Sequence, residues 1–400
     1  MARNDIYNSK DRWEKYVKNF DNLHVIIKDR KRKYHVKNKD NIKYFYKLAK
    51  SFEVDDLSFI RRIRLVNLLK QLCFFIDKDL NDVSNEDIDD LILEIRKISS
   101  SIKSLESTQH EIKQIAKKIG IDGFNEFKIR IDKSQERARL DKINYNEFNS
   151  LVKYFSNDPT MQILISLTFE CLSRPQENLF IKLKNIEWSE NYAIIKITEH
   201  GKEGLKELQS MESFPYLLKL YQKHPKRNDS ESYLFLNANK KQLTVHAANK
   251  RLKIACKCLD IKKPVTLYTF KRFGVTHKRQ NGVSDQEIQF TAGWTTTKQL
   301  YRTYDQSNQR DIFKIQRDRR FGNKDTIKET PKTKNCQFCG ELIGFAESNC
   351  PKCLRPSDPE EIKKQANQEQ KNMEKLVRAI EIMAKKLDPK SKEEVSEILR

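Results

Sequence analysis

The chain has 400 residues, of which 38% are hydrophobic and 34% charged, and its formal net charge at pH 7 is +22. This length predicts two or three domains. A solvated surface does not need so large a positive excess, so the charge favours a polyanionic partner, most simply nucleic acid; a generally basic proteome is the plainer alternative. The most apolar stretch, Met161 to Leu172, is too short to cross a bilayer, and the polar start lacks a secretory signal, so no membrane association is expected.

Residues 1–140 are predicted to form a helical domain, because they contain no proline and almost no glycine. Apolar residues recur at helical spacing from Phe59 to Ile76, and Ser84 with Asp87 approaches the spacing of a capping box. Between Lys28 and Lys50, ten Lys and Arg residues stand against two acids. This basic stretch suits a phosphate-lined surface, and the alternative is a solvated helix face whose rings point into the core. The interleaved rings are those of Tyr34, His35, Tyr44, Phe45 and Tyr46.

Residues 141–313 are predicted to form a second, mainly helical domain that contains a small antiparallel β-sheet. The apolar run from Met161 to Leu172 predicts a buried helix. From Tyr192 to Thr198 the residues alternate loosely in polarity and glycines follow, which predicts a β-hairpin or small meander. Helices are expected again from Pro215, and residues 314–334 are expected to be a basic linker.

Four short motifs in this domain contain side chains suited to binding a phosphate. Ser173 and Gln176 have capping-box spacing, which predicts that Arg174 stands at a helix N-terminus and can fork onto a phosphate; the plainer interpretation pairs it with Glu177. Lys202 lies in a predicted turn, where a lysine is normally only solvated. The other motifs are Lys271-Arg272, at the start of a predicted helix, and Gly293-Trp294, which two tyrosines follow.

Taken in this order, the motifs resemble those of the tyrosine recombinase (phage integrase) family over roughly residues 140–308. Tyr304 lies ten residues beyond Trp294, as the family's nucleophile does, whereas Tyr301 lies seven beyond and is expected to pack the helix. The resemblance implies that Arg174 contacts the scissile phosphate and that Trp294 donates a hydrogen bond to it. It also implies that Lys202 protonates the leaving 5′-oxygen and that Tyr304 forms a phosphotyrosyl ester, with no metal or ATP needed for the chemistry.

The chain departs from the family pattern at the second phosphate-binding cation. The family has His and Arg in an H-x-x-R motif, and counting back from Trp294 places Lys271 at the arginine and Tyr268 at the histidine. Arg272 is the immediate neighbour. Either Lys271 is the second cation, or a shift of one residue lets Arg272 serve.

Four of the eight cysteines form two C-x-x-C pairs, Cys336 with Cys339 and Cys350 with Cys353. Four thiolates at this spacing suit a closed, tetrahedral structural zinc site, predicted as a zinc ribbon over residues 335–356. Such a ribbon behind the tyrosine also resembles archaeal members of the family. Residues 357–400 are expected to be a helical tail, either a short coiled coil or a helix packed on the body.

The resemblance implies a site-specific DNA recombinase, such as the integrase of a mobile element or virus, that cuts and rejoins double-stranded DNA through a 3′-phosphotyrosyl intermediate. It implies a helical core-DNA-binding domain over residues 1–140, a tetramer on DNA, and a cytoplasmic, nucleoid-associated protein. Two alternatives stay open. One is a DNA-binding protein of the same fold that has lost turnover, and the other is a zinc-ribbon interaction protein whose middle domain is a scaffold.

Overall fold

The computed structural model describes residues 9–25, 34–99, 101–124, 127–131, 141–197, 206–307, 309–321, 330–357 and 359–385. The chain divides into two compact units, Met1–Ala138 and Arg139–Arg400. Lys202, with the turn around it, and residues 28–33 of the basic stretch lie outside the described residues. Within these ranges no helix has the length and apolar character needed to cross a membrane.

The first unit is built of helices around an apolar core. Its α-helices are α1 (Ser9–Val17), α2 (Ile42–Val54), α3 (Phe59–Phe75), α4 (Asn85–Ile98) and α5 (Ile102–Ile119). Short turns of 3₁₀-helix join them: η1 (Phe20–Asn22), η2 (Lys39–Asn41), η3 (Leu80–Asp82) and η4 (Asp122–Phe124). Leu65, Leu69 and Leu72 of α3 are buried, because residues three and four apart share one helix face.

Two predictions for this unit can be compared with the structure. The capping box at the start of α4 is confirmed: the Ser84 N–H donates to Asp87 Oδ2 at 2.7 Å, and the Asp87 N–H donates to Ser84 Oγ. The rings of the basic stretch divide between core and surface. Tyr44 and Phe45 are buried in α2, whereas Tyr46 is exposed on the side of the helix that also carries exposed lysines. Those lysines are Lys43, Lys47 and Lys50.

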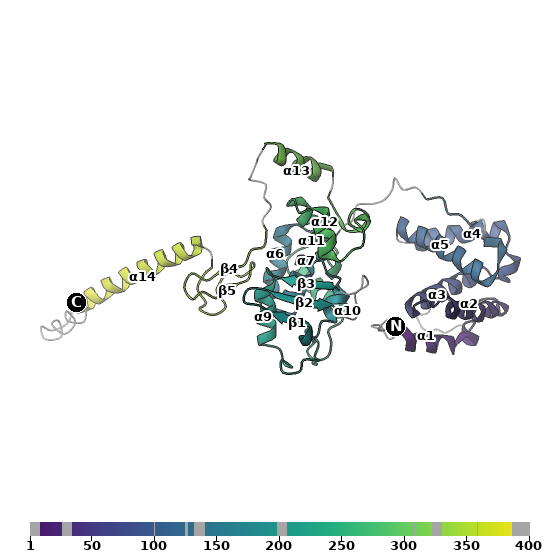
Figure 1. Cartoon of the computed structure of the whole chain (residues 1–400), viewed down its shortest axis with the longest axis horizontal. Helices are drawn as coiled ribbons and strands as arrows, with labels where there is room; N and C mark the ends of the chain where they lie inside the picture. Colours follow the sequence, from purple (N-terminus) through teal and green to yellow (C-terminus); the bar gives the residue numbers. More distant parts are fainter. Residues whose placement is uncertain are drawn as a thin grey trace. The chain divides into compact units, whose positions relative to one another are not determined.

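The second unit is also mainly helical, with a small antiparallel sheet (Figure 1), so the predicted fold class is confirmed. Its α-helices are α6 (Tyr145–Tyr154), α7 (Pro159–Glu170), α8 (Pro175–Leu179), α9 (Phe214–Gln222), α10 (Val245–Cys258), α11 (Leu267–Gln280), α12 (Asp285–Ala292) and α13 (Gln309–Phe321). The 3₁₀ turns η6 (Phe155–Asn157) and η7 (Leu183–Asn185) and the π-helix η8 (Leu300–Tyr304) complete this part.

The sheet is the meander that the sequence predicts. Strands β1 (Ile186–Trp188), β2 (Ala193–Ile197) and β3 (Lys206–Ser210) pair antiparallel in chain order. Ile195 pairs with Ile186 on one side and with Leu208 on the other. Alternate residues of β2 are buried because successive side chains of a strand point to opposite faces.

Helices α7 and α11 cross closely at the centre of the second unit (Figure 1). The predicted buried helix is confirmed, since α7 is buried on all sides from Met161 to Phe169. Gly274 of α11 permits the crossing, because a Cβ there would lie 2.3 Å from the carbonyl oxygen of Phe169. This packing fixes the end of α7, from which the chain enters the candidate site.

The first part of the expected linker over residues 314–334 is helical. Helix α13 continues to Phe321, so residues 314–321 are helical. Their many charged residues made the segment resemble a linker, but charged residues other than Asp are good helix formers.

The C-terminal module contains the strands β4 (Lys334–Asn335) and β5 (Leu342–Ile343), which pair antiparallel, and it is followed by α14 (Pro359–Lys385). The loop after β5 packs into the core of the second unit through Phe345 and Ala346. In α14 the apolar residues Met373 and Leu376 are exposed.

Candidate active site

Arg174 lies where the chain leaves α7 and begins α8. It is the N-cap residue of α8, and its N–H donates to Glu177 Oε2 at 2.8 Å while its Nη1 donates to Oε1 at 3.1 Å. The prediction that Ser173 with Gln176 forms the cap is therefore wrong by one residue. Glu177 reaches back instead, because its carboxylate accepts from both the backbone and the guanidinium of Arg174.

Glu177 and Lys206 form a buried ion pair that the sequence analysis did not identify. The Lys206 Nζ lies 2.6 Å from Glu177 Oε2, and the Glu177 side chain is only 1% exposed. Burial alone would raise the pKa of Glu177, but the charge and hydrogen bond of Lys206 outweigh it, so the pKa is lowered. Lys206 is the first residue of β3, four residues beyond Lys202. Its position directly after the predicted turn is the sequence feature that could have identified it as a site residue.

Lys271 is fully buried in α11, and its Nζ lies 5.3 Å from the ring centre of Trp294 and 4.9 Å from that of Tyr304. Among the described residues the Nζ atom has no hydrogen-bond partner. Burial lowers the pKa of Lys271 well below its ordinary value, the positive charges of Lys206 and Arg174 lower it further, and only Glu177 opposes them.

Arg272 points away from this cluster. Its guanidinium forms an ion pair with Asp141, whose carboxylate also accepts hydrogen bonds from Thr269 at 3.2 Å and Gln306 at 3.0 Å. Neighbouring residues of a helix point about 100° apart, so Lys271 and Arg272 cannot face the same group.

Trp294 and Tyr304 form the other wall of the cluster. Gly293, with a φ of 69°, ends α12 in the left-handed conformation that a glycine adopts easily. The Trp294 and Tyr304 rings then stack with their centres 5.0 Å apart, and both residues are buried. The Trp294 Nε1 has no hydrogen-bond partner among the described residues.

Tyr301, which was expected to pack the helix, lies outside the buried cluster. It is 51% exposed, its hydroxyl donates to Asp285, and Arg279 lies over its ring at 5.0 Å. Arg279 also pairs with Asp305, the residue after Tyr304. A π-helix turns each successive side chain less than an α-helix does, and such turns are frequent at functional sites. These contacts anchor the two ends of η8 on either side of the buried Tyr304.

The structure thus brings four of the predicted residues into one buried cluster: Arg174, Lys271, Trp294 and Tyr304. Arg272 lies outside it, and Lys202 lies outside the described residues. The cluster unites the end of α7, a face of α11 and the segment after α12. It combines cationic groups, an indole donor and a phenol, which suits a reaction at a phosphate.

The four predicted metal ligands also come together. One sulfur atom from each of Cys336, Cys339, Cys350 and Cys353 lies within 4.8 Å of the others. Gly340, directly after the first pair, adopts a φ of 73° that allows the tight turn. The set could hold a tetrahedral metal ion such as zinc, and four protein ligands would leave no position open for catalysis.

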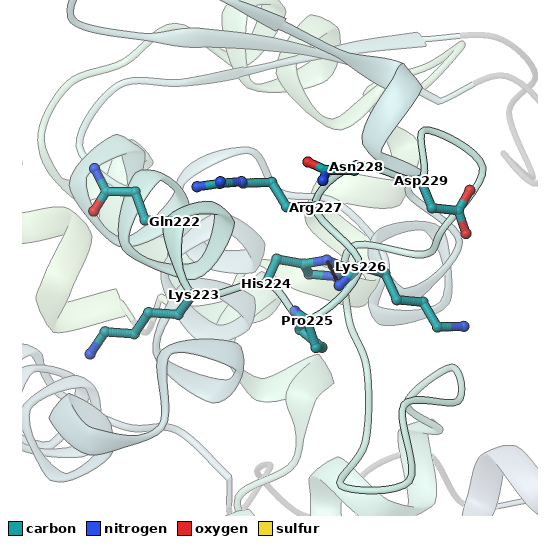
Figure 2. A pocket seen from close by; sticks show the side chains of 8 residues that line it. All are labelled: Gln222, Lys223, His224, Pro225, Lys226, Arg227, Asn228 and Asp229. Carbon is teal, nitrogen blue, oxygen red and sulfur yellow. Dashed lines mark hydrogen bonds between the residues drawn. The ribbon is translucent and has the colours of Figure 1, made fainter.

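A separate cavity of about 690 Å³ lies in the loop from Gln222 to Asp229 (Figure 2). Within it the imidazole of His224 is partnered by the Tyr233 carbonyl at 3.1 Å and by the N–H of Lys226 at 3.2 Å. None of the predicted site residues lines this cavity.

Known proteins resemble this chain in part of its sequence and in its fold. Residues 138–310 match the phage integrase family. No match was found among curated proteins.

Two solved structures have a similar fold at low sequence identity. The Tn1549 transposon integrase in complex with transposon right end DNA is 12% identical with a TM-score of 0.56, covering 69% of this chain and 98% of that one. A lambda integrase dimer bound to a COC′ core site is 12% identical with a TM-score of 0.55, covering 67% of this chain and 77% of that one. Residues 138–310 are therefore similar to the phage integrase family, and the chain shares its fold with these two integrases.

Proposed function

We propose that this protein is a site-specific DNA recombinase that cuts and rejoins double-stranded DNA through a 3′-phosphotyrosyl intermediate. One observation carries the proposal: a tyrosine, two cationic side chains and an indole from distant parts of the chain converge in one buried cluster. They are Tyr304, Arg174, Lys271 and Trp294. The alternative of a DNA-binding protein without turnover is not favoured, because binding alone does not require a tyrosine beside buried cations.

The chemistry follows from what each side chain offers. Tyr304 attacks the scissile phosphorus in line, and negative charge builds on the non-bridging oxygens. Arg174 can fork onto two of these oxygens, and the N–H of Trp294, which has no partner among the described residues, can donate to one of them. Lys202 is proposed to protonate the leaving 5′-oxygen. The phosphotyrosyl ester retains the energy of the broken bond, so rejoining needs neither ATP nor a metal.

The proposed partner is double-stranded DNA, with residues 1–140 gripping its backbone and a homo-oligomer, expected to be a tetramer, assembling on it. The net charge of +22 and the exposed lysines of α2 support DNA binding. The lambda integrase was observed as a dimer bound to a core site and as a tetramer bound to a Holliday junction. We further propose an integrase of a mobile element with a structural zinc ribbon, acting in the cytoplasm at the nucleoid.

A nicked suicide substrate tests the proposal, because loss of the small 5′ fragment traps the covalent intermediate. Wild-type protein is expected to form a covalent DNA adduct. Tyr304→Phe is expected to bind DNA with unchanged affinity and to form no adduct, since it lacks the attacking oxygen. Tyr301→Phe is the matched control and is expected to form the adduct, because its hydroxyl is on the surface. Gel electrophoresis under denaturing conditions measures the adduct.

Two outcomes would contradict the proposal in different ways. If only Tyr301→Phe loses the adduct, the nucleophile has been assigned to the wrong tyrosine. If no adduct forms with wild-type protein on any cognate DNA it binds, the protein is not a recombinase of this kind.

A further inference from the structure

Lys271 occupies a position that is unfavourable for a permanently charged, phosphate-binding side chain. The residue is 0% exposed, and among the described residues its amine donates to no carboxylate or carbonyl oxygen. A buried ammonium without hydrogen-bond acceptors is strongly disfavoured. The rings of Trp294 and Tyr304 lie beside it, with their centres 5.3 Å and 4.9 Å from Nζ.

The charges around Lys271 further disfavour its protonated form. Arg174, at the start of α8, and Lys206, at the start of β3, are both cationic neighbours, and Glu177 is the opposing anion. Glu177 is already bound to both of those cations. The other packed elements contribute apolar side chains: Leu172 after α7, Ile288 and Ala292 of α12, and Leu300 of η8 surround the same cluster. The DNA-free site therefore favours the neutral amine, consistent with the lowered pKa of Lys271.

A neutral amine beside a phenol can do what a guanidinium cannot. The guanidinium of an arginine stays protonated under all ordinary conditions, whereas a buried lysine can lose its proton and act as a base. The Lys271 Nζ lies 4.9 Å from the centre of the Tyr304 ring, so the amine and the phenol are neighbours within the buried cluster.

We propose that Lys271 is the general base that accepts the phenol proton of Tyr304 during DNA cleavage. The inference rests on the recombinase function proposed above. As the Tyr304 oxygen forms its bond to phosphorus, its proton passes to Lys271 Nζ, and the bond from phosphorus to the 5′-oxygen breaks. The leaving oxygen takes a proton from the general acid. The new ammonium then stands beside the phosphoryl group and returns its proton to Tyr304 when the strand is rejoined.

This proposal assigns different tasks to the two basic side chains of the cluster, Arg174 and Lys271. Arg174 is held at the helix terminus by two contacts to Glu177, and it carries a permanent charge toward the phosphate. Lys271 becomes charged only as the reaction proceeds. The site therefore does not need a second permanently charged side chain to bind the phosphate. Replacing Lys271 with arginine, which keeps the charge and loses the base, separates the two possible roles.

The test uses suicide DNA with sulfur in place of the bridging 5′-oxygen. A thiolate leaves without a general acid, so the rate of cleavage then depends on activation of Tyr304 and not on Lys202. Single-turnover rates are measured at saturating wild-type, Lys271→Arg, Lys271→Met and Arg272→Lys protein. Arg272→Lys is the matched control, because its partner Asp141 lies outside the cluster and lysine preserves the charge.

Lys271→Arg and Lys271→Met are both expected to slow cleavage by about 100-fold or more, the usual contribution of a general base. Arg272→Lys is expected to stay within a few-fold of wild type. The wild-type rate is expected to rise with pH and to level off below the ordinary pKa of a free tyrosine. Binding affinity, measured separately, is expected to change little.

Cleavage by Lys271→Arg at a rate near wild type would overturn the inference and make Lys271 a phosphate-binding cation. If Lys271→Arg does not fold, as judged by its melting curve, the wild-type pH profile decides, and a flat profile overturns the inference. Absence of any adduct with the wild-type protein would instead contradict the proposed function itself, so the two failures are distinguishable.

Discussion

Burial of Lys271 is expected to lower the stability of the protein at neutral pH. The folded protein lowers the pKa of this amine, whereas the unfolded chain keeps the ordinary lysine value. Folding must therefore release a proton whenever the pH lies between these two values, at a cost of at most about 1.4 kcal/mol per pH unit. The cost is largest at the low end of that window and disappears as the pH rises to the ordinary lysine value.

Lys271→Met is accordingly expected to raise the melting temperature while it abolishes cleavage. Methionine is of similar length and carries no charge, so it fits the space beside the stacked rings of Trp294 and Tyr304. The gain over wild type is expected to shrink between pH 7 and pH 9.5, as thermal melts at several pH values would show. A gain that is constant or grows with pH would mean that Lys271 is charged in the folded protein.

The sequence predicted which residues come together better than it predicted their surroundings. The family's spacing from Trp294 selected Lys271 and Tyr304, and both lie beside the Trp294 ring. The sequence left Lys271 and Arg272 as alternatives, and only the tertiary contact with Asp141 separates their directions. The pair of Glu177 and Lys206 was missed because it joins segments that lie far apart in the chain.

Among the elements, the crossing of α7 and α11 positions the site most directly. Gly274 of α11 contacts the backbone of α7 and also Leu172, two residues before Arg174. A Cβ on Gly274 would lie 2.7 Å from Leu172 Cδ2. The clash with the Phe169 carbonyl is with backbone and cannot be relieved by a rotamer change. The helices would have to move apart, and Arg174 would move with the end of α7.

Gly274→Ala is therefore expected to destabilise the protein by about 1–3 kcal/mol, the usual cost of overpacking. It is also expected to slow formation of the covalent adduct more than it weakens DNA binding. Gly123→Ala is the matched control, since a Cβ there meets only ordinary contacts at 3.5 Å. Chemical denaturation and adduct formation measure both effects; equal stability of the two variants would contradict the packing argument.

Elements with a clear apolar pattern were predicted well from the sequence, and those without one were not. The alternation in β2 has the period of a strand, and the continuous apolar run of α7 has the length of a buried helix. Helix α13 has no such pattern: Phe313 and Phe321 are exposed, and charged residues fill most of the rest. Its helical extent could not be separated from a linker by composition.

At the scale of the whole molecule, the four-cysteine module is part of the second unit and not an independent appendage. The Ala346 N–H donates to the buried Tyr216 hydroxyl at 2.8 Å, and the Phe345 ring stacks on Phe148 at 5.8 Å. Glu347 accepts from Lys219 at 3.2 Å. Phe148 in turn stacks on Phe169 of α7, at 4.3 Å. The loop that follows β5 thus joins the cysteine cluster to the helix that leads to Arg174.

Metal removal is consequently expected to destabilise the second unit as well as the cysteine module. Without a metal ion the four thiols no longer hold β4, β5 and the loop after β5 in place, and the contacts of residues 345–347 are lost with them. Purified full-length protein is expected to contain about one equivalent of zinc, as one four-thiolate site binds one ion. Chelation should lower the melting temperature of the whole second unit and not only remove a minor early transition.

Phe345→Ala separates docking from metal binding. The variant retains all four cysteines, so it is expected to keep the metal, yet it loses an aromatic contact of order 1 kcal/mol. For a unit of this size that loss lowers the melting temperature by about 2–4 °C. Calorimetry of the wild type and the variant, each with and without chelator, should show a smaller effect of chelation in the variant, because part of the coupling is already broken. Chelation that removes the metal and leaves the main transition of the wild type unmoved would mean that the cysteine module folds independently of the site.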